Sequence, residues 1–198
     1  MAGFWTDAGI EPKRQYRWLC HVGGMDPWLC KKVTKPKVTI SETSHKFLNH
    51  TFYYPGRADW ETVALTLADP VTPDTANVMF GKFLASGWNF PDNYSNSIST
   101  ISKAKSTVGL GEVRILQLGA NATSADEPNV IEQWTLVNGW IKDIAFGDLD
   151  YESENMVDIT VTLRYDYAIL EGFGGSARAA QQAQDGAPPP RPGQLPGA

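Results

Sequence analysis

Hydrophobic and polar side chains alternate strictly near the end of the chain, from residue 156 to residue 168. The odd positions are apolar or aromatic and the even positions are polar: Val157, Ile159, Val161, Leu163, Tyr165 and Tyr167 alternate with Asp158, Thr160, Thr162, Arg164 and Asp166. Successive side chains of a strand point to opposite faces, so this pattern predicts one strand with a core face and a polar face.

The same alternation recurs earlier, from residue 60 to residue 68, where Val63, Leu65 and Leu67 share one face. Shorter alternating or apolar runs predict further strands at 15–22, 111–118 and 130–138. Segments rich in turn-forming residues, 119–129 and 139–155, separate the last of these strands.

One helix is predicted at 73–86. Thr72 is expected to cap it, Pro73 fits its first turn, and Asp74 suits the positive end of the helix dipole. Gly87 is expected to end it. Its apolar stripe, which should pack on a sheet, comprises Ala76, Met79, Phe80, Phe83 and Leu84. The polar segment 89–107 is expected to be a long surface loop.

A turn at 23–27 is expected to join the strand at 15–22 to a hairpin partner at 28–34, with Cys20 opposite Cys30. Two reduced thiols are the expected state because disulfides are rare in the cytoplasm; a cross-strand disulfide remains open. The polar segment 31–55 follows, and Pro36 keeps it out of a central strand. It is expected to form a protruding hairpin or loop.

These elements predict a mainly β (α+β) fold, namely a compact β-barrel or two packed antiparallel sheets, with one flanking helix and a protruding hairpin. The predicted organisation is an N-terminal arm at 1–14, one domain at 15–170 and a tail at 171–198. The tail is rich in Gly, Ala, Gln and Pro, and a disordered segment is expected there.

The chain has 198 residues and a net charge of -5, which argues against a protein that grips nucleic acid through surplus Lys and Arg. No secretory signal or membrane-spanning run is seen, so assembly in the cytoplasm is expected. The acidic run 148–154 lacks the glycine and final glutamate of an EF-hand loop. No zinc spacing, nucleophile elbow or dinucleotide loop is found, so no enzyme activity, metal or cofactor is expected.

Six sequence segments, in this order and spacing, resemble the tail-tube protein of contractile-tailed bacteriophages, which is related to the tube proteins of contractile-injection and secretion systems. They are WLCKK at 28–32 with KP at 35–36, YPGRADW at 54–60, VALTL at 63–67, FGKFLASGW at 80–88, VNGWI at 137–141 and TVTLRYDY at 160–167. The segment 89–107 and the tail beyond Glu171 depart from the family pattern.

The resemblance implies a barrel-like fold of two sheets flanked by a helix, six copies in a ring, and rings stacked into a hollow tube. It also implies that DNA leaves through the lumen, without specific binding, when the sheath contracts. The implied partners are further copies of the chain and the sheath, baseplate and terminator proteins, and the implied location is a virion tail.

Two sets of residues are candidates for this assembly. The first set would line the lumen. The polar strand faces offer few positive charges to DNA, although an ordinary solvent-facing surface also explains them. The lumen candidates are Thr62, Thr66, Asp158, Thr160, Thr162 and Arg164.

The second set would join subunits. Opposite charge clusters predict a head-to-tail interface that adds rings, although two solvated loops also explain them. The candidates for this interface are Lys31, Lys32, Lys35, Lys37, Asp148, Asp150, Glu152 and Glu154.

Other functions remain open from the sequence. A tube-initiating baseplate subunit, a tail-terminator ring and a secretion-system tube subunit belong to the same structural class. The seven tryptophans also allow a carbohydrate-binding β-sandwich module, although core and interface packing explains most of them.

Overall fold

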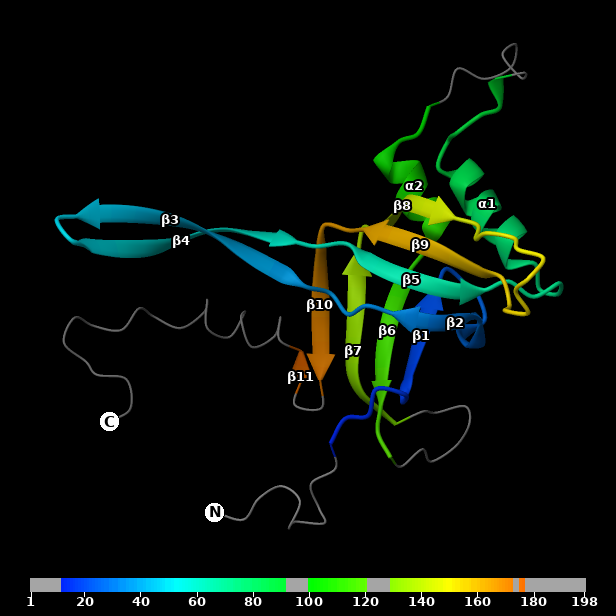
Figure 1. Cartoon of the computed structure of the whole chain (residues 1–198), viewed down its shortest axis with the longest axis horizontal. Helices are drawn as coiled ribbons and strands as arrows, with labels where there is room; N and C mark the ends of the chain where they lie inside the picture. Colours follow the sequence, from blue (N-terminus) through cyan, green and yellow to red (C-terminus); the bar gives the residue numbers. More distant parts are fainter. Residues whose placement is uncertain (1–11, 92–99, 121–128, 173–174, 177–198) are drawn as a thin grey trace.

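Two antiparallel sheets form the body of the protein in the computed structural model, which describes residues 12–91, 100–120, 129–172 and 175–176 (Figure 1). Sheet A contains, in spatial order, β1 (Trp18–Val22), β6 (Val113–Leu118), β7 (Val130–Val137), β10 (Tyr167–Gly172) and β11 (Gly175–Ser176). Sheet B contains β2 (Cys30–Val33), β5 (Val63–Ala68), β9 (Asp158–Arg164) and β8 (Trp140–Ala145). The predicted mainly β class is confirmed, and the described strands form no closed barrel.

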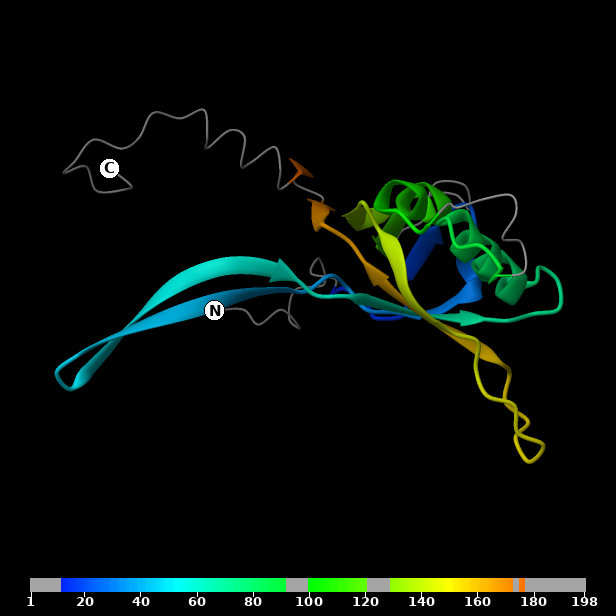
Figure 2. The ribbon, with the colours of Figure 1, turned by 90° about the horizontal axis from the view of Figure 1, so that it is seen from above.

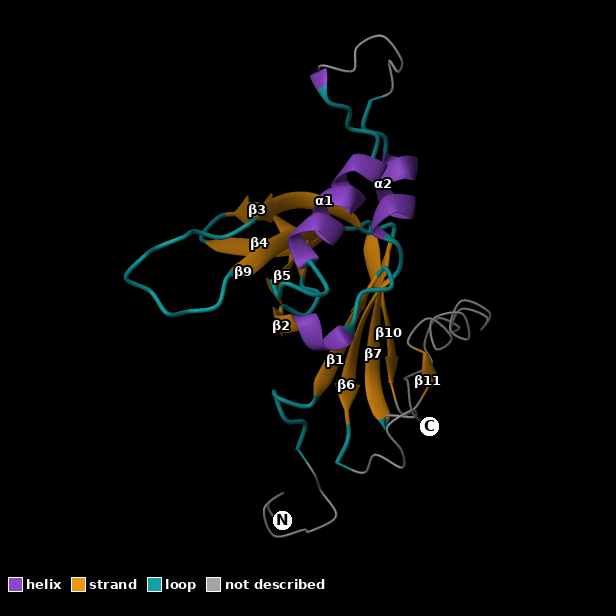
Figure 3. Ribbon diagram, turned by 90° about the vertical axis from the view of Figure 1, so that its right-hand side faces the viewer, coloured by secondary structure: helices purple, strands orange, loops and turns teal. Residues whose placement is uncertain are grey.

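A separate hairpin and two α-helices complete the described fold. The hairpin pairs β3 (Val38–Phe47) with β4 (His50–Trp60) and extends far from the sheets, as predicted (Figure 1). The helices α1 (Thr75–Ala85) and α2 (Lys103–Leu110) pack beside each other near one end of sheet A (Figure 3). A short 3-10 helix, η1 (Pro27–Leu29), precedes β2.

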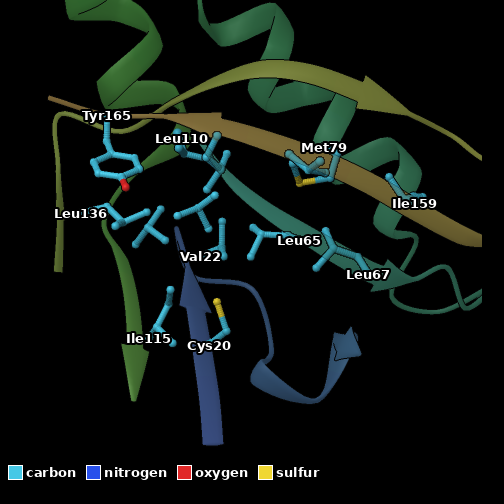
Figure 4. Packing of buried hydrophobic residues seen from close by; sticks show 14 residues of the cluster. Cys20, Val22, Leu65, Leu67, Met79, Leu110, Ile115, Leu136, Ile159 and Tyr165 are labelled. Carbon is cyan, nitrogen blue, oxygen red and sulfur yellow. The ribbon is translucent and has the colours of Figure 1, made fainter. Parts of the chain in front are cut away.

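The core lies between the two sheets and beneath the helices (Figure 4). The predicted alternation of β5 and β9 is confirmed, because Leu65, Val161 and Leu163 are all 0% exposed. Met79 of α1 and Leu110 of α2 are also 0% exposed and close the core from the helical side. The two helices therefore hold their place through burial of apolar side chains at the end of the sandwich.

The predicted strand at 156–168 is wrong in one respect: it is two strands in different sheets. β9 ends at Arg164, and β10 begins at Tyr167 in sheet A. The corner between them is held by Asp166, whose carboxylate accepts hydrogen bonds from Lys103 at 2.7 Å and Asn138 at 2.8 Å. Tyr165, 3% exposed, still enters the core, but Tyr167, also expected on the core face, is 42% exposed, and Ala168 packs against the core instead.

The predicted hairpin between the strands at 15–22 and 28–34 is also wrong. β1 pairs with β6, whereas β2 pairs with β5 in the other sheet, and η1 carries the chain across. Both cysteines are free thiols, with Cys20 buried and Cys30 half-buried. The hydrogen bond between the two thiols, together with burial, raises the pKa of Cys20. The same hydrogen bond lowers the pKa of Cys30.

The helix α1 begins later than predicted. Asp74, not Thr72, is its N-cap, and its carboxylate accepts a hydrogen bond from the backbone N–H of Asn77 at 2.8 Å. Of the predicted stripe only Met79 is fully buried. The aromatic members Phe80 and Phe83 are half-buried and contact other rings instead, namely Trp88, Phe90 and Phe146.

Besides η1, the helix α2 and the strand β8 were not predicted. The segment 89–107, expected to be a loop, contains the start of α2, which Ser102 caps through the backbone N–H of Lys105. The described residues therefore contain two flanking α-helices, where the sequence predicted one. The turn-rich segment 139–155 contains β8. Most of the expected N-terminal arm and C-terminal tail lies outside the described residues.

Candidate assembly surfaces

One face of sheet B is open. The helices and sheet A lie on one side of β5 and β9, and no described element covers the other side (Figure 2). Thr66 and Thr160 are direct register partners on this open face, and Thr162 lies opposite Ala64. Thr160 is exposed, and its neighbours Val161 and Ile159 point into the core.

The structure brings five of the six lumen candidates together on this open face. They lie at alternate positions of β5 and β9, so their side chains share one face of sheet B: Thr66, Asp158, Thr160, Thr162 and Arg164. Thr62 lies in the two-residue link between β4 and β5, outside the strands, and is half-buried.

The open face carries charged side chains of both signs, and Lys32 and Asp143 were not among the lumen candidates. Lys32 of β2 lies opposite Thr66, and Arg164 lies on β9. Neither side chain has an ion pair in the described part of the chain. On the acidic side, Asp143 lies opposite Thr162, and both carboxylate oxygens of Asp158 lie 2.8 Å from Lys31 Nζ. The open face therefore carries both positive and negative side chains among its threonine hydroxyl groups.

Both edges of sheet B lack a partner strand among the described residues. The edge strands are β2 and β8, at opposite ends of the order β2-β5-β9-β8. Every neighbouring pair in this sheet is antiparallel, so β2 and β8 run in opposite directions. An unpaired edge exposes backbone N–H and C=O groups that bind a further strand. The two edges are thus suited to pair with each other between copies in the same antiparallel pattern.

Three of the four lysines proposed for contacts between subunits have partners within the chain. Lys31 pairs with Asp158, Lys35 with Glu132 at 2.6 Å, and Lys37 with Glu61 at 2.7 Å. Lys32 is exposed and has no such partner in the described part of the molecule. Lys32 is therefore the member of the cluster that is most available to a second copy.

Glu132 joins two distant parts of the chain to its own strand, β7. Its carboxylate accepts hydrogen bonds from Lys13, from Lys35 between β2 and β3, and from Trp134 Nε1 at 2.7 Å. Burial opposes ionisation of this carboxyl group, which is 10% exposed, but the three hydrogen bonds outweigh it and lower its pKa to about 2. The site fixes where the chain leaves β2 for the protruding hairpin.

The four predicted acidic residues lie in the loop between β8 and β9, at residues 146–157. This loop projects from the body at the opposite end of the molecule from the β3–β4 hairpin (Figure 2). None of its carboxylates has an ion pair within the described residues; they are Asp148, Asp150, Glu152 and Glu154. Leu149 is 88% exposed, and the Tyr151 side chain is fully exposed, so the loop also presents apolar surface.

The tryptophans do not form an exposed platform in the described part of the chain. Trp28 in η1 is 60% exposed, whereas the other described tryptophans are half-buried: Trp18, Trp60, Trp88, Trp134 and Trp140. Stacking of sugar rings needs open aromatic faces, so the carbohydrate-binding interpretation gains no support from these positions. No cluster of three metal-ligating side chains occurs among the described residues. No described helix is long and apolar enough to cross a membrane.

Comparison with solved structures shows which proteins share this arrangement. A chain of the extended sheath–tube complex of the extracellular contractile injection system PVC superposes with a TM-score of 0.57 at 14% identity, covering 81% of this chain and 92% of that one. A chain of the tube-terminating cap of the anti-feeding prophage gives 0.57 at 12% identity, covering 82% and 92%.

A chain of the anti-feeding prophage baseplate gives a TM-score of 0.54 at 15% identity, covering 82% of this chain and 97% of that one. This protein has the fold of contractile injection system tube, cap and baseplate proteins. The relationship predicted from the sequence is thus confirmed at the level of the tube-protein fold. No family model matches the chain, and no curated protein sequence matches it.

Proposed function

We propose that this protein is a structural subunit of the hollow tube of a contractile particle. One observation carries the proposal: sheet B has two unpaired edges of opposite direction and an open, polar face among the described residues. A head-to-tail contact repeated around an axis closes into a ring. Pairing of β8 in one copy with β2 in the next continues the sheet around that ring and satisfies both edges.

In this ring the open face of sheet B becomes the lumen wall. Thr66, Thr160 and Thr162 present hydroxyl groups to the channel, while Lys32 and Arg164 add charge. We propose six copies per ring, since the baseplate that contains one of the structural neighbours is described as sixfold symmetrised. Rings stack into a tube, with sheath, baseplate and terminator proteins as further partners.

The protruding hairpin supports assembly independently of the sheet edges. An isolated two-stranded hairpin is at best marginally stable in water. β3 and β4 nevertheless expose large side chains, with Phe47 62% and Tyr53 65% exposed. Contacts with other copies bury these side chains, which the described part of this chain leaves exposed.

The finer proposal is that the particle is a phage tail and that DNA passes through the lumen. A wall of hydroxyl groups and scattered charges of both signs offers no continuous basic track along which phosphates bind tightly. The particle would then be assembled in the host cytoplasm and carried in the virion tail.

Electron microscopy of the purified protein at increasing concentration tests the proposal. Long hollow tubes are expected. Cysteines placed on two faces then test the lumen: in assembled tubes Thr160→Cys should react with a small maleimide but not with a bulky one. Val108→Cys, on the helical side and 82% exposed in the free chain, is the comparison. Equal reaction of both variants with the bulky reagent would reject the lumen assignment and leave the fold intact.

A ring-forming cap or baseplate subunit is the second candidate function. The observation that favours it is the equal TM-score, 0.57, for the chain from the tube-terminating cap and the chain from the sheath–tube complex. Single rings that do not elongate at any concentration would support this candidate, and a secretion-system tube subunit would form tubes without phage partners. Monomers that bind glycans would contradict the whole structural class.

A further inference from the structure

The acidic β8–β9 loop and the start of β2 lie at the same end of sheet B, on opposite edges. Ala145, the last residue of β8, pairs with Thr160 near the start of β9. Cys30, the first residue of β2, pairs with Leu67 near the end of β5, and Leu67 pairs with Ile159. The right-hand end of sheet B in Figure 1 therefore carries both features.

This placement has a direct consequence when copies join edge to edge. A neighbouring β8 that lies antiparallel to β2 ends beside the residues where β2 begins. The loop 146–157 of that neighbour then emerges next to η1 and the first residues of β2. A contact between rings is not needed to bring the acidic loop and the basic strand together.

The two surfaces that meet in this way are complementary in chemistry. The loop supplies four carboxylates without ion pairs in the described structure, together with the exposed side chains of Leu149 and Tyr151. The start of β2 supplies Lys32, and η1 supplies Trp28, which is 60% exposed. The exposed Asp26 at the start of η1 adds one carboxylate on that side. The acidic loop and Lys32, which has no ion pair in the described chain, still present opposite charges beside apolar surface, a combination typical of specific protein interfaces.

We propose that the acidic β8–β9 loop of one copy docks on Trp28 and Lys32 of its neighbour within the same ring. The inference rests on the proposed ring function and names the partner of this surface as a second copy of the chain. The charge pattern of the sequence alone predicted a contact between stacked rings. The proposed contact lies instead between neighbouring copies of the same ring. It also gives a role to Trp28, which the described residues leave 60% exposed.

Charge reversal at Lys32 tests the proposal. Lys32→Glu should raise the protein concentration needed for half-maximal ring formation by about tenfold or more at low salt, because a lost attraction becomes a repulsion at every interface of the ring. Asp150→Lys should act in the same direction from the other side. The double variant Lys32→Glu/Asp150→Lys should recover to within about threefold of the unmodified protein.

Lys105→Glu is the matched control. Lys105 is exposed on α2, has no ion pair in the described chain, and lies outside the acidic loop, η1 and β2. This variant makes the same charge change and should assemble like the unmodified protein. Sedimentation velocity measures ring formation, and negative-stain microscopy measures the stacking of rings.

The outcomes separate this inference from the proposed function. If the unmodified protein forms no rings, both are overturned. If it forms rings and Lys32→Glu matches Lys105→Glu, only the lateral contact is overturned. Lys32→Glu rings that form at the normal concentration but fail to stack would also overturn it, because the loop would then act between rings. Loss of rings in both single variants with recovery in the double variant supports it.

Discussion

Replacing Glu132 with glutamine should lower the stability of the fold in a way that depends on pH. Glu132 holds Lys13, Lys35 and Trp134 through one carboxylate, and these contacts tie the N-terminal residues and the β2–β3 link to β7. Glutamine keeps the size of the side chain and an acceptor oxygen but removes the charge. The variant therefore isolates the electrostatic part of the site.

The magnitude follows from the pKa of Glu132, which falls from 4.5 to about 2. At about 1.36 kcal/mol per pH unit, this difference corresponds to at most about 3.4 kcal/mol of stability at neutral pH. Lys13 and Lys35 are 54% and 44% exposed, so solvent screens the attraction. We therefore expect Glu132→Gln to lower the free energy of unfolding by roughly 2 kcal/mol at pH 7.

The direction of the pH effect is fixed by the lowered pKa. A carboxyl group whose pKa is depressed by folding stabilises the protein fully above its unfolded value of 4.5 and loses that effect as the pH falls towards 2. The difference between the two proteins should shrink to less than roughly 1 kcal/mol at pH 3. Urea unfolding, followed by tryptophan fluorescence at low protein concentration, measures both values.

The control is Glu61→Gln, which removes a carboxylate that also pairs with a lysine but lies on the surface beside the hairpin. Its loss of stability at pH 7 should be much smaller than that of Glu132→Gln, because solvent screens an ion pair whose side chains are 69% and 45% exposed. A Glu132→Gln difference that stays constant from pH 7 to pH 3 would refute the reasoning, because the loss would then come from packing and not from the charge.

Three further predictions concern the fold that positions the assembly surfaces, each measured by urea unfolding. Met79→Ala should cost about 2–5 kcal/mol because Met79 is 0% exposed in the core, whereas Val78→Ala on the exposed side of α1 should cost far less. Asp74→Ala should cost about 1 kcal/mol by removing the N-cap of α1, and Asp74→Ser should retain most of that stability. Gly23→Ala should cost more than about 2 kcal/mol, since φ is +47° and a Cβ would meet the Leu110 carbonyl oxygen, whereas Gly24→Ala, with no atom nearby, should cost about 1 kcal/mol.

The strands could be predicted where burial repeats with a period of two. The core faces of β5 and β9 follow directly from the alternation, because one face of each strand is fully buried. The same alternation carries no information about which sheet a strand joins. In the sequence it continues from Ile159 to Tyr167 while the chain changes sheets, although Tyr167 is 42% exposed in the structure. At the corner, Lys103 and Asn138 contact Asp166 from distant parts of the sequence, and the alternation does not reveal these contacts.

The assembly surfaces were only partly predictable for a related reason. Alternate residues of a strand share one face, so most of the lumen candidates lie together on sheet B. The pairing of lysines depends on tertiary structure: Lys31 reaches Asp158 over 127 residues, and Lys35 reaches Glu132 over 97. Trp28 was expected inside a strand at 28–34, so its exposed position in η1 was not predicted.

The two sheets differ in the faces that they turn away from the core, and this difference favours sheet B as the channel wall. On sheet A, Leu19 and Leu116 are register partners outside the core cluster, so its outer face is partly apolar. On sheet B, the central strands β5 and β9 turn only alanine, threonine and charged side chains outward. An apolar face gains from contact with protein, whereas a face of small polar groups loses little by staying in water. A ring built through the edges of sheet B therefore leaves its polar face in the solvent-filled channel and sheet A available for contacts outside it.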